Sequence, residues 1–270
     1  MSINEKLDKL KEILKEMGSV VLGFSGGVDS TFLLRVASDV LGDKVMAITA
    51  SSAAFPQREM NEAIMFAGNN KIKHKVIVSE ELDIDGFSQN PIDRCYHCKK
   101  ELFTKISQTA KEEGFKYIID GANVDDKGDY RPGMDAAREL GVRSPLLEAG
   151  LNKADIRALS KDMDLPTWDK PSFACLSSRI PYGQEITREK LGMIDIAEQY
   201  LLDKGFRQVR VRHHGEIARI EVAPNEREKF FSLNLMDETA SKFKEIGFNY
   251  VTLDIKGYRT GSMNEALNKE

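Results

Sequence analysis

The segment Ser25-Gly26-Gly27-Val28-Asp29-Ser30 places two glycines and two hydroxyl side chains where a strand gives way to a helix. The apolar run 20–24 precedes it, and a helix is predicted over 30–41. Glycine lets a backbone approach a ligand closely and adopt positive φ. The N–H groups of such a loop and of a helix N-terminus attract anions. The segment therefore predicts a phosphate-binding loop, to which Ser25 and Ser30 add hydroxyl donors.

Two better-known nucleotide loops are excluded by the same residues. The segment lacks the Gly-Lys-Ser/Thr ending of a Walker A loop, and it does not match the G-x-G-x-x-G fingerprint of dinucleotide-binding folds. The competing interpretation is an ordinary glycine-rich turn in which Asp29 or Ser30 caps the helix.

Three cysteines form the second group with chemical potential. Cys95 and Cys98 make a C-x-x-C pair, and Cys175 lies far along the chain. An odd number of cysteines in a cytoplasmic setting favours metal binding or catalysis over a disulfide framework. We favour a 4Fe–4S cluster held by three thiolates, which leaves one iron open to a non-protein ligand such as sulfide. The alternatives are inert thiols, a redox dithiol, or a zinc site completed by His74, His97, His213 or His214.

A third feature is the alternation of Arg210 and Arg212 with Val209 and Val211. Successive side chains of a strand point to opposite faces. The pattern predicts that the valines enter a core and that the arginines face outward on a solvated surface.

Alternating elements must position these residues. Apolar strands separated by helices predict a doubly wound α/β domain, with a parallel sheet covered on both faces. Its strands are expected at 20–24, 45–50, 75–78, 117–120 and 144–147. Its helices are expected at 4–17, 30–41, 58–68, 98–113, 134–140 and 153–163.

A change of composition marks the end of this domain. The proline-bounded segment 166–171 and the string Ile180-Pro181-Tyr182-Gly183 indicate a connector. A small α+β domain follows, with helices predicted at 187–204, 225–232 and 237–245 and strands at 208–212, 217–222 and 250–255. We therefore expect an α/β domain over 1–168, a connector carrying Cys175 over 169–184, and an α+β domain over 185–270.

Composition restricts the class of protein. A net charge of −4 argues against a surface built for nucleic acid. No run approaches the roughly 18 to 20 apolar residues of a membrane span. Residues 1–15 are amphipathic and charged, unlike a secretory leader. We expect a cytoplasmic protein that acts on a small molecule.

Several strings carry a family resemblance. Ser-Gly-Gly-x-Asp-Ser after the first strand resembles the PP-loop of the ATP pyrophosphatase superfamily. Over essentially the whole chain, the order of motifs resembles the LarE family, ATP-dependent sulfur transferases of nickel-pincer nucleotide biosynthesis. The strings that resemble this branch are Asp120-Gly121-Ala122-Asn123, 129–133, 177–183, 209–213, 250–254 and 257–264.

The resemblance implies an activity and its site residues. ATP would be cleaved between its α- and β-phosphates with Mg²⁺, and a carboxylate of pyridinium-3,5-biscarboxylic acid mononucleotide would be adenylated and converted to a thiocarboxylate. A later enzyme would load the product with nickel for lactate racemase and related enzymes. ATP and pyrophosphate would be held by Ser25, Gly26, Gly27, Asp29, Ser30, Ser51 and Gly121, with Asp29 also a possible Mg²⁺ ligand. The catalytic residues would be Cys175, Ser178 and Arg179, and the substrate phosphate would meet Arg210, Arg212 and Arg131.

Family members differ in the source of sulfur. Some have one connector cysteine and sacrifice its sulfur. The presence of Cys95 and Cys98 instead resembles members with a three-cysteine 4Fe–4S cluster, so Cys175 is expected to be a cluster ligand. The resemblance also implies a sulfide donor or sulfur carrier as partner and a hexamer of identical chains.

Three other functions compete with this interpretation. A tRNA-thiolating enzyme would need a broad basic surface, which the net charge of −4 does not favour. An amide-forming ligase of the NAD or GMP synthetase type would leave the three cysteines without a role. A nucleotide-binding regulatory or metal-storage protein would keep the loop without turnover.

Overall fold

The computed structural model describes residues 1–84, 86–126 and 132–259. The chain forms two compact units. The first comprises Met1–Phe87 with Asp93–Phe173, and the second comprises Ser88–Ile92 with Ala174–Glu270. The division falls inside the predicted connector. Arg131 lies outside the described residues, and so do the last residues of the 257–264 string.

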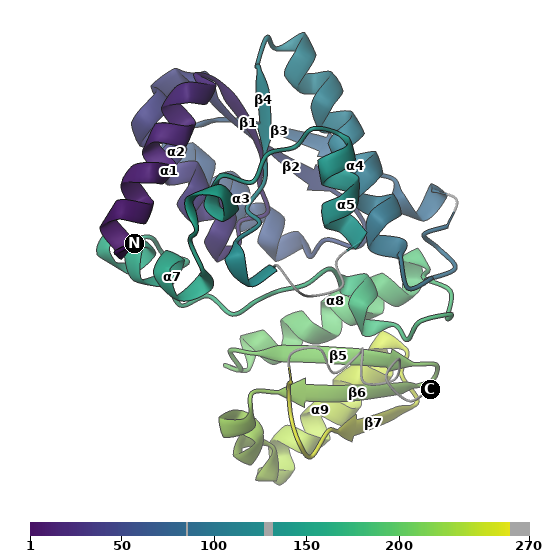
Figure 1. The fold of residues 1–270 in the computed structure, drawn as a ribbon. Coiled ribbons are helices and arrows are strands. Elements are labelled where there is room, and N and C mark those ends of the chain that lie inside the picture. The colour runs from purple at the N-terminus through teal and green to yellow at the C-terminus, as the bar shows by residue number, and fades with distance from the viewer. Residues whose placement is uncertain (85, 127–131, 260–270) are drawn as a thin grey trace. The chain divides into compact units, whose positions relative to one another are not determined.

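The first unit is built on a four-stranded parallel sheet with strand order β3-β2-β1-β4 (Figure 1). The strands are β1 (Val20–Gly23), β2 (Val45–Ser51), β3 (Lys73–Val78) and β4 (Tyr117–Ile119). Its helices are α1 (Ile3–Met17), α2 (Val28–Leu41), α3 (Gln57–Asn69), α4 (Arg94–Glu112), α5 (Pro132–Glu139), α6 (Pro145–Ala149) and α7 (Lys153–Asp162). The predicted doubly wound α/β class is confirmed.

Alternation along β1 shows why both faces of this sheet are covered. Val20 and Leu22 enter one apolar cluster with residues of α1, α2, α6 and α7. Val21 enters a second cluster with Phe103 and Ile106 of α4. Successive side chains point to opposite faces, so a strand that is apolar at every position needs helices on both sides.

One predicted strand is wrong. Residues 144–147 do not form a strand, because a short helix, α6, occupies Pro145–Ala149. Proline lacks the N–H that a strand would donate to its neighbour, and it suits the first turn of a helix. The only strand-like pairing near this segment in the described residues is a single bridge between Ile119 of β4 and Arg143, just before the predicted strand.

The second unit is a three-stranded sheet packed against helices (Figure 1). Its elements are α8 (Arg188–Asp203), β5 (Val209–His214), β6 (Ile217–Val222), α9 (Leu233–Ile246) and β7 (Tyr250–Leu253). β5 and β6 form the predicted antiparallel hairpin, and β7 pairs parallel to β6. The helix predicted over 225–232 is a 3-10 helix over Pro224–Phe231, and Phe230 packs in the apolar core near its end. No helix in the described part of the chain is long and apolar enough to span a membrane.

Gly257 allows the C-terminal segment to close over the second sheet. Its φ is +73°, and a Cβ at this position would lie 2.6 Å from the carbonyl oxygen of Val222. The next residue, Tyr258, donates its N–H to that same oxygen at 2.8 Å. We expect Gly257→Ala to lower the free energy of unfolding by about 2–4 kcal/mol, because it adds both backbone strain and a clash.

Urea denaturation of the full chain checks this prediction. Gly215→Ala is the matched control, since Gly215 also has positive φ (+63°) but open space around its Cβ position. An equal loss in the two variants would show that the contact with Val222 contributes nothing.

Candidate active site

The glycine-rich loop joins β1 to α2 in the first unit. Gly27 is the N-cap of α2, and Gly26 adopts a φ of +66°. The hydroxyl oxygens of Ser25 and Ser30 lie 3.1 Å apart, and Ser30 donates to the carbonyl oxygen of Gly27 at 3.3 Å. Backbone N–H groups and two hydroxyls therefore gather at a helix N-terminus, as an anion site requires.

The loop lies where the winding of the sheet reverses, between the carboxyl ends of β1 and β4. Ligands of open α/β sheets bind at such positions. A Cβ on Gly121, just after β4, would lie 3.2 Å from the backbone nitrogen of Ser30, and one on Gly26 would lie 3.3 Å from the Cβ of Ala63. Ser51 ends β2 at the same edge of the sheet. The structure thus brings the predicted nucleotide-binding residues together, and their contact with ATP remains a prediction.

Asp29 lies in the first turn of α2 and forms an ion pair with Lys153, the first residue of α7. Its other carboxylate oxygen, Oδ1, is buried and has no hydrogen-bond partner among the described residues. Such an oxygen carries an uncompensated desolvation cost, and carboxylate oxygens are the ligands Mg²⁺ prefers. The residues therefore fit a Mg²⁺ ion beside the loop. Sequence reasoning missed Lys153, since no motif marks it apart from its place after the capping residue Asn152.

Cys95 lies in the first turn of α4, which begins at Arg94, and Cys98 begins the second turn. The helix predicted over 98–113 therefore starts one turn earlier than expected. Residues three apart share a helix face, so the two thiols are placed to act together. Cys175 belongs to the second unit and precedes a 3-10 turn, Leu176–Arg179. Within the described residues, no three histidine, cysteine or acidic side chains are grouped to hold a metal ion.

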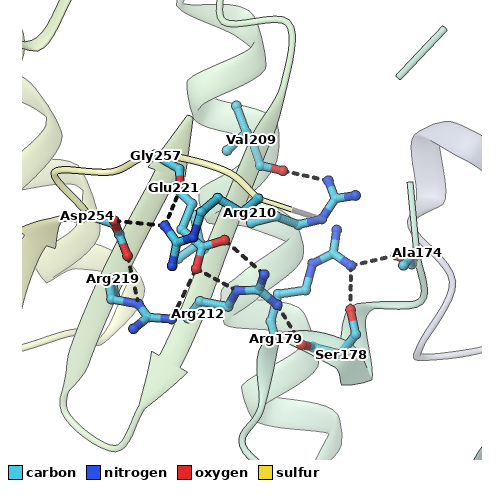
Figure 2. A network of polar contacts seen from close by, with 12 residues as sticks. Ala174, Ser178, Arg179, Val209, Arg210, Arg212, Arg219, Glu221, Asp254 and Gly257 are labelled. Carbon is cyan, nitrogen blue, oxygen red and sulfur yellow. Dashed lines mark hydrogen bonds and ion pairs between the residues drawn. The ribbon is translucent and has the colours of Figure 1, made fainter. Parts of the chain in front are cut away.

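Arg179 donates to Ala174 and Ser178, which flank Cys175 in the sequence (Figure 2). Its Nε and Nη2 donate to the two carboxylate oxygens of Glu198, at 2.8 and 2.9 Å. Its Nη1 donates to the carbonyl oxygens of Ala174 and Cys175, at 2.6 and 3.0 Å, and to the hydroxyl of Ser178 at 2.9 Å. The side chains of Arg179 and Glu198 are both 0% exposed. This geometry favours a positioning role for Arg179, while its predicted contact with substrate stays a prediction.

The expectation that Arg210 and Arg212 face solvent is wrong. They do point away from the valines of β5, but they are only 2% and 7% exposed. The guanidinium of Arg210 lies over the ring of Tyr258, 5.1 Å from its centre, because the C-terminal segment crosses this face of the sheet. Two buried arginines on one strand favour an anion-binding site, whereas two solvent-exposed arginines would not.

Arg212 connects the sheet to the turn after Cys175 (Figure 2). Its Nε and Nη2 donate to Glu221 at 3.1 and 2.8 Å, and its Nη1 donates to the carbonyl oxygen of Ser178 at 2.8 Å. Arg219 also donates to Glu221, at 3.0 Å. One buried carboxylate therefore orients two guanidinium groups.

The network carries an excess of positive charge. Among the described residues that form it, five arginines face three carboxylates. Its members are Arg179, Arg210, Arg212, Arg219 and Arg259 with Glu198, Glu221 and Asp254. Burial, together with the Arg179 charge, lowers the pKa of Arg210 from its ordinary value to about 10, which still leaves it a cation at neutral pH. A dianionic phosphate would balance this excess.

Sequence reasoning missed the two glutamates that orient these arginines. Both are 0% exposed. Glu198 lies between Ala197 and Leu201 on the apolar face of α8, and Glu221 lies in the apolar strand β6. An acidic residue inside an apolar pattern is almost never buried unless it is paired. That signal was available in the sequence.

The ion pair of Glu198 predicts a dependence of stability on pH. Burial alone would raise the pKa of Glu198, but the charge and hydrogen bonds of Arg179 outweigh it, so the pKa falls below 4.5. Stabilisation from this group is therefore present above about pH 4.5, its unfolded value, and is lost as the pH falls through the lower folded value. Glu198→Gln should flatten the acid limb of the curve of unfolding free energy against pH, measured in urea between about pH 3 and 7. A variant at the exposed Glu228, E228Q, should keep the slope of the native chain.

Several known proteins are similar in sequence to this chain. A family model described as NAD synthase matches residues 2–110, which include the glycine-rich loop. A protein of Synechocystis sp. is 43% identical over 99% of this chain and 100% of its own length. Pyridinium-3,5-bisthiocarboxylic acid mononucleotide synthase of Lactiplantibacillus plantarum is 38% identical over 95% of this chain and 92% of its own length. The chain belongs to the family of this synthase, the LarE family. A Methanocaldococcus jannaschii protein, 30% identical over 95% of this chain and 98% of its own length, is also similar. The LarE resemblance predicted from the motifs is thus confirmed.

Proposed function

We propose that this LarE-family chain is an ATP-dependent sulfur transferase that converts carboxylates of pyridinium-3,5-biscarboxylic acid mononucleotide into thiocarboxylates. The name of the L. plantarum relative supports the identity of the product. The observation that carries the proposal is the group of three buried arginines, Arg179, Arg210 and Arg212, of which Arg179 contacts the backbone of Cys175. That arrangement suits a phosphorylated small molecule held next to a sulfur-bearing residue.

The first step is activation of the carboxylate. A carboxylate oxygen of the substrate attacks the α-phosphorus of ATP, the bond to the bridging oxygen breaks, and pyrophosphate leaves. The loop N–H groups and the hydroxyls of Ser25 and Ser30 hold the departing pyrophosphate and stabilise its charge. Mg²⁺, held by Asp29, would neutralise phosphate charge when it is bound.

The second step replaces oxygen with sulfur. Sulfide adds to the activated carbonyl carbon, AMP leaves with the former carboxylate oxygen, and the proton of hydrosulfide passes to solvent. Arg210 and Arg212 bind the phosphate of the mononucleotide, and Arg179 fixes the backbone at Cys175. A 4Fe–4S cluster held by Cys95, Cys98 and Cys175 would supply a sulfide at the iron that no thiolate ligates. A sulfide donor or sulfur carrier, a cytoplasmic location and a hexameric assembly complete the proposal.

The decisive experiment measures pyrophosphate release and the mass of the product. With ATP, Mg²⁺ and sulfide, we expect release only when the pyridinium mononucleotide is present, together with exchange of one oxygen for one sulfur. Release that required tRNA instead would favour a tRNA-thiolating enzyme. If neither the mononucleotide nor tRNA led to release of pyrophosphate, the proposal would be contradicted.

The metal content tests the cluster separately. Chain purified without oxygen should hold about four iron and four acid-labile sulfide per chain, and replacing any of the three cysteines should remove them. Zinc, or no metal after reconstitution, would reject the cluster and return Cys175 as a sacrificial source of sulfur.

A further inference from the structure

Lys170 makes three polar contacts beside the glycine-rich loop that the proposed mechanism leaves unused. Its ammonium donates to the carbonyl oxygen of Gly26 at 3.1 Å and to Glu62 at 2.6 Å, and it pairs with Glu59 at 2.7 Å. Its side chain is only 12% exposed, and that of Glu59 is 4% exposed. A lysine ammonium has three N–H donors, so all three are occupied.

The contact with Gly26 determines where the loop points its next donor. The carbonyl of Gly26 and the N–H of Gly27 belong to one peptide group, which is trans. In a trans peptide these two groups point in opposite directions. Lys170 holds the carbonyl from one side, and this directs the N–H of Gly27 toward the other side.

Helix α3 packs closely against Gly26. A Cβ on Gly26 would lie 3.3 Å from the Cβ of Ala63 and 3.5 Å from the carbonyl oxygen of Glu59. Glu59 and Glu62, which hold the ammonium of Lys170, are on this helix. The loop, α3 and Lys170 therefore form one packed assembly.

The segment that carries Lys170 is itself fixed to the first unit. Arg157 of α7 donates to the carbonyl oxygens of Trp168 and Lys170, at 2.7 and 2.8 Å. The guanidinium of Arg58 lies 4.6 Å from the ring centre of Phe173. Lys170 thus ties the loop to a segment that ends two residues before Cys175.

We propose that Lys170 is a positioning residue for pyrophosphate binding, which orients the Gly26–Gly27 peptide toward the anion without touching it. The inference rests on the proposed function only in that the loop binds pyrophosphate. The competing explanation is that Lys170 does no more than neutralise Glu59 and Glu62. The two explanations differ in what happens when a carboxylate is removed together with the lysine.

The test compares the affinity of the full chain for pyrophosphate with Mg²⁺, measured by calorimetry, among matched variants. Lys170→Met should weaken binding about tenfold to a hundredfold, the usual effect of losing a charged hydrogen bond that orders a site. Lys170→Met with Glu62→Gln removes one charge of each sign and leaves Glu59 its ion pair with Arg58, at 3.5 Å, so it should recover the native unfolding midpoint but keep the weakened affinity. The control is Lys161→Met, since Lys161 contacts only the ring of Trp168 among the contacts described for its ammonium, at 4.9 Å from the ring centre.

Each outcome decides between the explanations. Native pyrophosphate affinity in the double variant, or in Lys170→Met, would overturn the positioning role, and so would a native chain that binds no pyrophosphate. Binding of the mononucleotide should be unchanged in every variant, because its phosphate is assigned to the arginines of the second unit. If the native chain binds pyrophosphate but releases none with the mononucleotide, the proposed substrate is wrong while the role of Lys170 stands.

Discussion

Cys175→Ser is expected to abolish formation of the thiocarboxylate, with a loss of at least about a thousandfold, while leaving pyrophosphate release dependent on the mononucleotide. The two steps separate because the loop proposed to hold pyrophosphate is built from the first unit and Cys175 belongs to the second. Arg179 contacts the carbonyl oxygen of residue 175 and not its side chain, so serine should preserve the local backbone. Pyrophosphate is measured in a coupled assay, and the product is identified by mass spectrometry.

Variants of the other two cysteines distinguish the sources of sulfur. If a cluster supplies the sulfide, Cys95→Ser and Cys98→Ser should lose sulfur transfer as completely as Cys175→Ser. If Cys175 is sacrificed instead, these variants should complete one turnover, and the chain should lose the mass of hydrogen sulfide. Full sulfur transfer by Cys175→Ser would contradict both routes.

The sequence predicted the architecture well where the signal was local. The runs 20–24 and 45–48 are apolar on both strand faces, which requires cover on both sides of the sheet, and the structure supplies it. The loop residues Ser25–Ser30 and Gly121 were predicted from motifs, and the sheet brings them within contact of one another. The wrong strand at 144–147 came from giving more weight to apolar character than to Pro145.

Long-range pairing explains what the sequence did not predict. Alternation placed Arg210 and Arg212 on the face opposite the valines, but their burial depends on distant segments, because Tyr258 lies against Arg210 and the carbonyl oxygen of Ser178 accepts from Arg212. Lys153 and Lys170 reach the loop over separations of 124 and 144 residues. No spacing rule links residues so far apart, so these contacts appear only in the folded chain.

The largest effect on stability is expected from Arg179→Met. This change leaves the carboxylate of Glu198, which is 0% exposed, without the guanidinium that it faces. Breaking a buried ion pair by removing one partner typically costs about 3–5 kcal/mol, because the remaining charge is uncompensated. Urea denaturation, followed by a probe in the second unit, measures the loss. A change below about 1 kcal/mol would show that the pair is not an important source of stability.

A double variant separates the stability of this pair from its role at Cys175. Arg179→Met with Glu198→Gln removes the uncompensated charge and keeps an acceptor for the N–H of Val211, which Glu198 holds at 2.9 Å. Stability should therefore return toward the native value. The carbonyl oxygens of Ala174 and Cys175 still lose the donor that fixes them, so sulfur transfer should stay impaired about tenfold or more while pyrophosphate release stays native. Recovery of both stability and sulfur transfer would mean that Arg179 stabilises the unit without positioning Cys175.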